Sequence, residues 1–135
     1  MIRIGKKQYE LFCSIRALEN IGGRCGGIAH LGDWMTEEKD NIKKLGRFAA
    51  VIADLVNGDI ERQEVENGEK LPRMKAETIT ALMTPGNIMA QKDAIFEAIA
   101  EASRFDSGED EEDEETVDLD LEEIRAEKNG LSAGA

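Results

Sequence analysis

The chain has 135 residues and a formal net charge of -12, from 29 Asp and Glu against 17 Lys and Arg. Thirteen of the acidic residues lie in residues 106–128, so the first 105 residues, with 16 acidic and 15 basic side chains, are almost neutral. This distribution argues against nonspecific binding to nucleic-acid phosphates, which requires clustered Lys and Arg, and no apolar stretch is long enough to span a bilayer.

The uneven charge divides the chain into two parts. Residues 1–105 are numerous enough to bury one hydrophobic core, and we expect them to fold as one domain. Residues 106–135 form an acidic tail that we expect to be disordered, because its like charges repel and its apolar surface is too small to offset the ordering entropy. Cys13 and Cys25 are not spaced as a redox pair and no signal-peptide pattern is seen, which favours free thiols in a soluble protein.

The chain begins with an alternation of apolar and polar residues over residues 2–13, interrupted by Gly5-Lys6. Gly at the first turn position predicts a tight β-hairpin. Because an isolated two-stranded hairpin is marginal in water, the face with Tyr9, Leu11 and Cys13 is expected to pack on helices.

Two helices are predicted next. Ser14 can cap a short helix over residues 15–21, which Gly22-Gly23 would end, and residues 22–32 are predicted to be a loop. Thr36 can cap a long central helix that ends before Gly58, because apolar residues recur there at threes and fours: Ile42, Leu45, Ala49, Ile52 and Val56.

The remaining elements are also helical. The polar residues 59–73 read as a surface loop, residues 75–83 have apolar positions at helical spacing, and Thr84-Pro85-Gly86 interrupts the pattern. Residues 87–104 predict a second long amphipathic helix. Together these patterns predict a mainly α fold of the α+β type, with a short N-terminal β-hairpin packed on a compact bundle of three to four helices, followed by the acidic tail.

The sequence contains no recognisable catalytic or metal-binding constellation. His30 is the only histidine and has no partner at a suitable spacing. The glycine-rich residues 22–27 resemble a phosphate-binding loop in spacing, but Ile28-Ala29 stands where Lys and Ser or Thr are needed. Asp118-x-Asp120-x-Glu122 lacks the turn glycine and the final Glu of a calcium loop. We therefore expect no enzyme activity, cofactor or metal.

Two features are candidates for binding a partner protein. Trp34, the only tryptophan, is either a cover on the core or an interface anchor. The tail contains apolar residues among its acids, which can dock as an extended strand or an induced helix in an apolar, basic groove, or simply accompany a solubilising tail: Val117, Leu119, Leu121 and Ile124.

The run Ile4-Gly5-Lys6-Lys7-Gln8-Tyr9-Glu10-Leu11, followed by Ser14-Ile15-Arg16-Ala17-Leu18-Glu19-Asn20-Ile21, resembles the start of the tail assembly chaperones of long-tailed bacteriophages and prophages. In that family a short hairpin leads into a helix with an Arg-Ala-Leu core. Residues 79–85 and the helix after them resemble the second half of the family, so the resemblance covers most of residues 2–104.

The resemblance implies a non-enzymatic protein of the host cytoplasm that is absent from the finished virion. Its expected partners are the tape measure protein, which it would keep soluble, and the tail tube protein, which it would help to recruit. It implies no nucleic acid or membrane partner, leaves homo-oligomerisation open, and suggests a longer form made by frameshifting near the C-terminus. The alternative is an acidic regulatory or inhibitor protein that mimics nucleic acid and binds a basic partner, and an enzyme is the least favoured class.

Overall fold

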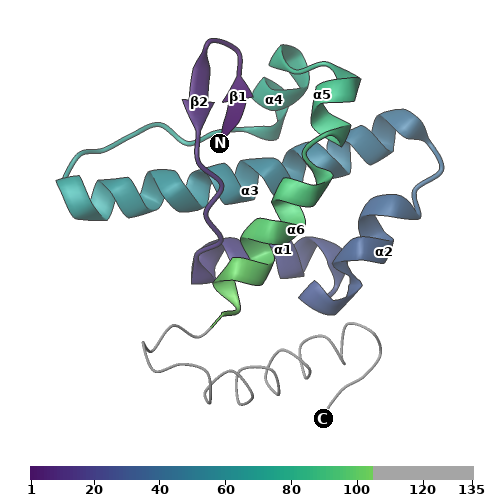
Figure 1. Cartoon of the computed structure of the whole chain (residues 1–135), viewed down its shortest axis with the longest axis horizontal. Helices are drawn as coiled ribbons and strands as arrows, with labels where there is room; N and C mark the ends of the chain where they lie inside the picture. Colours follow the sequence, from purple (N-terminus) through teal and green to yellow (C-terminus); the bar gives the residue numbers. More distant parts are fainter. Residues whose placement is uncertain (105–135) are drawn as a thin grey trace.

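The computed structural model describes residues 1–104, which form a short antiparallel hairpin and a set of helices (Figure 1). The hairpin comprises β1 (Ile2–Ile4) and β2 (Lys7–Tyr9), and the helices are α1 (Ile15–Cys25), the 3-10 helix η1 (Ile28–His30), α2 (Leu31–Thr36), α3 (Asn41–Asn67), α4 (Ala76–Leu82), α5 (Pro85–Met89) and α6 (Lys92–Ala102). The predicted mainly helical fold with an N-terminal hairpin is confirmed. The predicted acidic tail lies outside the described residues.

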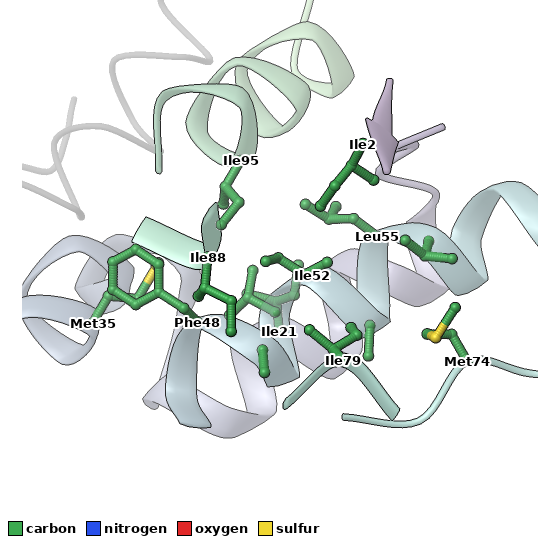
Figure 2. Close-up of a cluster of buried hydrophobic side chains, with 14 of the residues drawn as sticks. Ile2, Ile21, Met35, Phe48, Ile52, Leu55, Met74, Ile79, Ile88 and Ile95 are labelled. Atoms are coloured by element: carbon green, nitrogen blue, oxygen red, sulfur yellow. The ribbon is translucent and has the colours of Figure 1, made fainter. Parts of the chain in front are cut away.

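Helix α3 is the centre of the fold. Figure 1 shows the hairpin, α4 and α5 on one side of it and α1 and α2 on the other. Every residue of α3 from Phe48 to Val56 is buried, so the helix is enclosed on all sides along this stretch. Figure 2 shows how side chains from the surrounding elements meet those of α3, among them Ile2, Ile21, Ile79, Ile88 and Ile95.

The predicted start of the central helix at Thr36 is wrong. The cap is Asp40, whose carboxylate accepts hydrogen bonds from the backbone N–H groups of Ile42 at 2.9 Å and Lys43 at 3.2 Å. Thr36 instead ends α2, where its hydroxyl donates to the carbonyl of Gly32 at 2.8 Å. Ile42, predicted on the buried stripe, is 76% exposed, because the first turn of α3 extends beyond the core.

The predicted end of this helix at Gly58 is also wrong, as is the loop predicted over residues 59–67. Gly58 lies inside α3 where the segment between β2 and α1 crosses it, and the N–H of Phe12 donates to the carbonyl of Leu55 at 3.1 Å. A Cβ atom at Gly58 would lie 2.1 Å from the carbonyl oxygen of Phe12. The glycine therefore permits a close crossing, and the helix ends at Gly68, whose φ of 75° is left-handed.

The loop predicted over residues 22–32 is largely helical. Helix α1 passes through Gly22-Gly23 and buries Ala17, Ile21 and Cys25, which are four residues apart on one face. Gly26, with a left-handed φ of 80°, ends it. The predicted cap is confirmed, since the Ser14 hydroxyl accepts from the N–H of Ala17 at 3.1 Å.

The predicted helix over residues 75–83 is confirmed as α4, but the predicted helix over residues 87–104 is two helices. Thr84 caps α5 by accepting from the N–H of Asn87 at 3.2 Å, and the chain turns at residues 90–91 before α6 begins. Both helices contact α3. The turn lets Ile88 of α5 and Ile95 of α6 both enter the core. The sequence does not predict this turn, because residues 90–91 contain neither Gly nor Pro.

Candidate functional site

Within residues 1–104, no group of three or more His, Cys, Asp or Glu is placed to hold a metal ion. His30 is exposed at the end of η1. Cys13 and Cys25 are free and buried, and burial raises the pKa of the Cys13 thiol to about 11. That thiol is therefore protonated at neutral pH and is a poor nucleophile.

Two buried carboxylates of α3 are taken up in structural contacts. Asp54 accepts two hydrogen bonds from the guanidinium of Arg24, at 2.7 and 3.1 Å, which fixes α1 on α3. The hydrogen bond with Asp54 raises the pKa of the Arg24 guanidinium. Asp59 pairs with Arg62 and accepts from the side-chain amide of Gln63 at 2.6 Å. The Arg24 contact is bidentate, and these charge-assisted contacts satisfy both buried carboxylates.

The segment of residues 68–75, here called the strap, runs back along α3 after the helix ends (Figure 1). The side-chain amide of Asn57 accepts from the N–H of Met74 at 2.6 Å and donates to its carbonyl at 2.9 Å. The Met74 side chain is buried in the core cluster. One α3 side chain therefore replaces the backbone partner that the extended strap lacks.

Glu64 holds the strap at a second point. Its carboxylate accepts from the N–H of Leu71 at 2.6 Å and from the guanidinium of Arg73 at 2.8 and 3.0 Å. The hydrogen bonds from Arg73, and then that from Leu71, lower the pKa of Glu64 to about 2. Arg73 also lies 3.4 Å from Glu61 and donates to the carbonyl of Leu71 at 2.9 Å.

A groove with a volume of about 410 Å³ lies between β2 and the strap. It is larger than two other hollows beside α6, which measure about 210 and 250 Å³. We call it the hairpin groove, and it is lined by Lys7, Gln8 and Tyr9 of β2, Ile60 and Gln63 of α3, Leu71, Pro72, Arg73 and Met74 of the strap, and Thr78 of α4. Apolar side chains of α3 and the strap thus lie beside an edge of the sheet.

The backbone at this edge offers unpaired polar groups. In the hairpin Ile4 faces Lys7 and Arg3 faces Gln8. The pair that flanks a two-residue turn, here Ile4 and Lys7, exchanges two backbone hydrogen bonds, and the next pair, Arg3 and Gln8, exchanges none. The N–H and C=O of Gln8 therefore point away from β1. Within residues 1–104 no backbone hydrogen bond outside the ladder involves Gln8, whereas the polar backbone groups of Leu71 and Met74 are already bonded.

The charge of the lining distinguishes the hairpin groove from the other two hollows. Its charged residues are Lys7 and Arg73, with no carboxylate among the lining residues. One smaller hollow has Asp33 as its only charged lining residue, and the other has Glu101. Arg73 is paired with Glu64, but in the described part of the chain the hairpin cations Arg3, Lys6 and Lys7 form no ion pair. Of these three hollows, the hairpin groove is therefore the one suited to an acidic ligand.

The structure places Trp34 away from this groove. It is half-buried on α2, packs against the core, and is covered by Arg47, whose guanidinium carbon lies 4.8 Å from the ring centroid. Arg47 also donates to the Trp34 carbonyl and pairs with Glu38 at 3.3 Å. This geometry fits a cover on the core, and a role in partner binding stays a prediction.

The other predicted contacts, Val117, Leu119, Leu121 and Ile124, lie outside the described residues. Sequence reasoning missed the hairpin groove, because it depends on where the strap runs. None of the helices in residues 1–104 combines the length and apolarity needed to cross a bilayer. No protein-family model, curated protein or solved structure matches the chain.

Proposed function

We propose that this chain is a non-enzymatic tail assembly chaperone of a long-tailed phage or prophage. It would bind the tape measure protein, keep it soluble and help to recruit tail tube subunits. The observation that carries the binding role is the hairpin groove, which combines an apolar floor, an unpaired strand edge and the cation Lys7, with no carboxylate among its lining residues. The resemblance of residues 4–21 to the start of tail assembly chaperones supports the phage assignment.

The groove is suited to a segment of a polypeptide. Tyr9, Leu71 and Pro72 are half-buried or exposed and offer apolar contacts to the buried face of an amphipathic segment, above the buried Ile60 and Met74. Lys7 attracts carboxylates of the same segment. The tape measure protein, as a long helical partner, would present many such amphipathic segments before the tail is assembled. Covering them in the host cytoplasm, and leaving before the virion is complete, is the expected action of the chaperone.

Co-expression with the tape measure protein encoded nearby tests the proposal. We expect the tape measure protein to be recovered in the soluble fraction in a complex with this chain. Leu71→Ser removes an apolar contact of the groove and should reduce the recovered complex, whereas Leu18→Ser, at a half-buried leucine of α1 outside the groove, should not. Equal solubility of the partner with and without this chain, and no complex at low or high salt, would refute the proposal.

The concentration of 13 of the 29 acidic residues in residues 106–128 favours a second candidate. In it the chain is an acidic regulatory or inhibitor protein that mimics nucleic acid and occupies a basic partner. This candidate predicts that removal of residues 106–135 abolishes binding. The chaperone proposal predicts that residues 1–104 retain most of the affinity.

A further inference from the structure

We propose that in the free protein the hairpin groove is occupied by residues 117–121 of the same chain, docked as an extended strand against the free edge of β2. The docking needs no partner. Its consequence, that the tape measure protein must displace this segment, rests on the proposed function.

Charge selects this segment as the occupant. The charged residues that line the groove are Lys7 and Arg73, and because Arg73 is paired with Glu64 and Glu61, Lys7 supplies the uncompensated positive charge of the lining. Arg3 and Lys6 add to it from the same hairpin. Residues 106–128 carry 13 of the chain's 29 acidic residues. The two hollows beside α6 lie nearer along the chain, but each has a carboxylate as its only charged lining residue and would repel the segment.

The residue pattern of the segment matches the groove. Val117, Leu119 and Leu121 alternate with Asp118 and Asp120. In a strand successive side chains point to opposite faces, so the three apolar residues would face the groove floor, on the same face as Lys7 and Tyr9. The two carboxylates would face the solvent, on the face that carries Arg3 and Gln8. The unpaired N–H and C=O of Gln8 supply the backbone partners that strand addition requires.

The connecting chain is long enough for docking within one molecule. From Arg104 to Val117 there are 13 Cα–Cα steps, which span up to about 43 Å when extended. The longest element, α3 with its 27 residues, is about 40 Å long. A tethered segment also acts at an effective concentration near the millimolar range, so weak contacts suffice. A second copy paired through β2 would instead bring Lys7 close to the partner's Lys7, which disfavours that occupant.

Docking gives the tail a role in partner exchange. While residues 117–121 lie in the groove, its apolar floor and strand edge are covered, which limits nonspecific association. A tape measure segment that displaces them would release the acidic residues to solvent, where they keep the complex soluble. The tail then acts as an internal competitor whose strength depends on ionic strength, since exposed charges are screened over about 8 Å at physiological salt.

Paramagnetic relaxation in the full-length chain tests the docking. A nitroxide is attached at Thr116→Cys in ¹⁵N-labelled protein, where the buried Cys13 and Cys25 are poorly accessible to the reagent. We expect selective broadening of the amide signals of Gln8, Tyr9 and Leu71, weakened by high salt. In the same chain, Leu119→Ser with Leu121→Ser should abolish the broadening. The matched pair Glu111→Gln with Glu112→Gln, which keeps the alternating segment, should retain it.

The groove side has its own matched variants. Lys7→Glu should reduce the broadening by at least about half by reversing the attraction, whereas Lys92→Glu, at an exposed lysine of α6 outside the groove, should leave it unchanged. Absence of selective broadening, or broadening centred on Asp33 and Phe96, would overturn the proposal. In a control sample, ¹⁵N-labelled chains without a nitroxide are mixed with ¹⁴N chains that carry one. Selective broadening of the ¹⁵N signals in this mixture would show that the segment docks between molecules, and would also overturn the proposal.

These outcomes are separable from those of the proposed function. If the amide signals of the groove residues are not selectively broadened, but the tape measure protein is recovered in a soluble complex, only the docking is refuted. If those signals are broadened, but the chain has no effect on the tape measure protein, the chaperone proposal is refuted and the docking stands.

Discussion

The side-chain amide of Asn57 in α3 pairs with both polar backbone groups of Met74 in the strap, at 2.6 and 2.9 Å. An amide can do this because it carries an acceptor and a donor side by side, as a neighbouring strand would. The contact sets the register of the strap on α3 and so positions Leu71 and Met74 in the hairpin groove.

Asn57→Ala should therefore destabilise the fold. It leaves the N–H and C=O of Met74 without their partners in a half-buried place, at a cost of about 1–3 kcal/mol. Urea denaturation measures the change, with Asn20→Ala on the exposed face of α1 as the control. A cost near that of the control would show that water replaces the amide without loss.

The Glu64 clamp predicts a defined pH dependence. The pKa of Glu64 is lowered from 4.5 to about 2 in the folded chain, so its contribution to stability is fully present above about pH 4.5 and is lost as the pH falls toward 2. In Glu64→Gln this part of the acid dependence should be missing. Glu66→Gln, at an exposed neighbour, should keep it.

The measurement is the free energy of unfolding against pH for these two variants. The difference between their curves is the informative quantity, because all the other acidic residues are the same in the two variants. Parallel curves between pH 4.5 and 2 would contradict the clamp.

Gly58→Ala should be destabilising, although alanine normally favours a helix. The new Cβ would meet the carbonyl oxygen of Phe12 at 2.1 Å, so either α3 or the segment before α1 must move, at a cost of about 1–3 kcal/mol or more. Gly46→Ala is the matched control in the same helix. Apart from its chain neighbours and the backbone of its own helix, nothing lies within 4 Å of the position of the new Cβ, so that change should stabilise by up to about 1 kcal/mol. Thermal unfolding distinguishes the two signs.

The loss of stability on truncating an apolar side chain to alanine should increase with the burial of that side chain. Ile52→Ala and Ile95→Ala, at fully buried residues, should each cost roughly 2–5 kcal/mol. Leu45→Ala should cost less, because that side chain is only half-buried. Ile42→Ala, at a 76% exposed residue, should change stability by no more than about 0.5 kcal/mol. Equal losses at Ile42 and Ile52 in urea titrations would mean that the phase of α3 is wrong.

A chain ending at Arg104 should still unfold cooperatively. The described core cluster lies entirely in residues 2–99, and the hairpin groove is at the surface. We expect the thermal midpoint to fall by no more than a few degrees, since a docked tail segment would add only weak stabilisation. A loss of cooperative unfolding would show that residues 105–135 are part of the core.

The sequence by itself determined the elements whose signals are local. The Gly5-Lys6 turn, the Ser14 cap and the buried stripe through Ile52 all follow from turn chemistry, capping and periodicity within a few residues. The sequence also predicted the mainly helical fold with its N-terminal hairpin, because alternation stops at residue 13 and helical spacing follows. Ile42 shows the limit of periodicity, because the same apolar stripe continues into the first turn of α3, which no other element of residues 1–104 covers.

Only the tertiary structure decided what the glycines and the polar residues of the middle region do. Gly58 appeared to end a helix, but its role is set by Phe12, a residue far away in the chain that crosses it closely. Glu64 lies in a segment predicted to be a surface loop, and no local pattern marks a role for Asn57. Each of them binds the strap, whose path the sequence does not predict. The hairpin groove exists because that path runs beside β2, and contacts between distant segments are set by global packing rather than by local pattern.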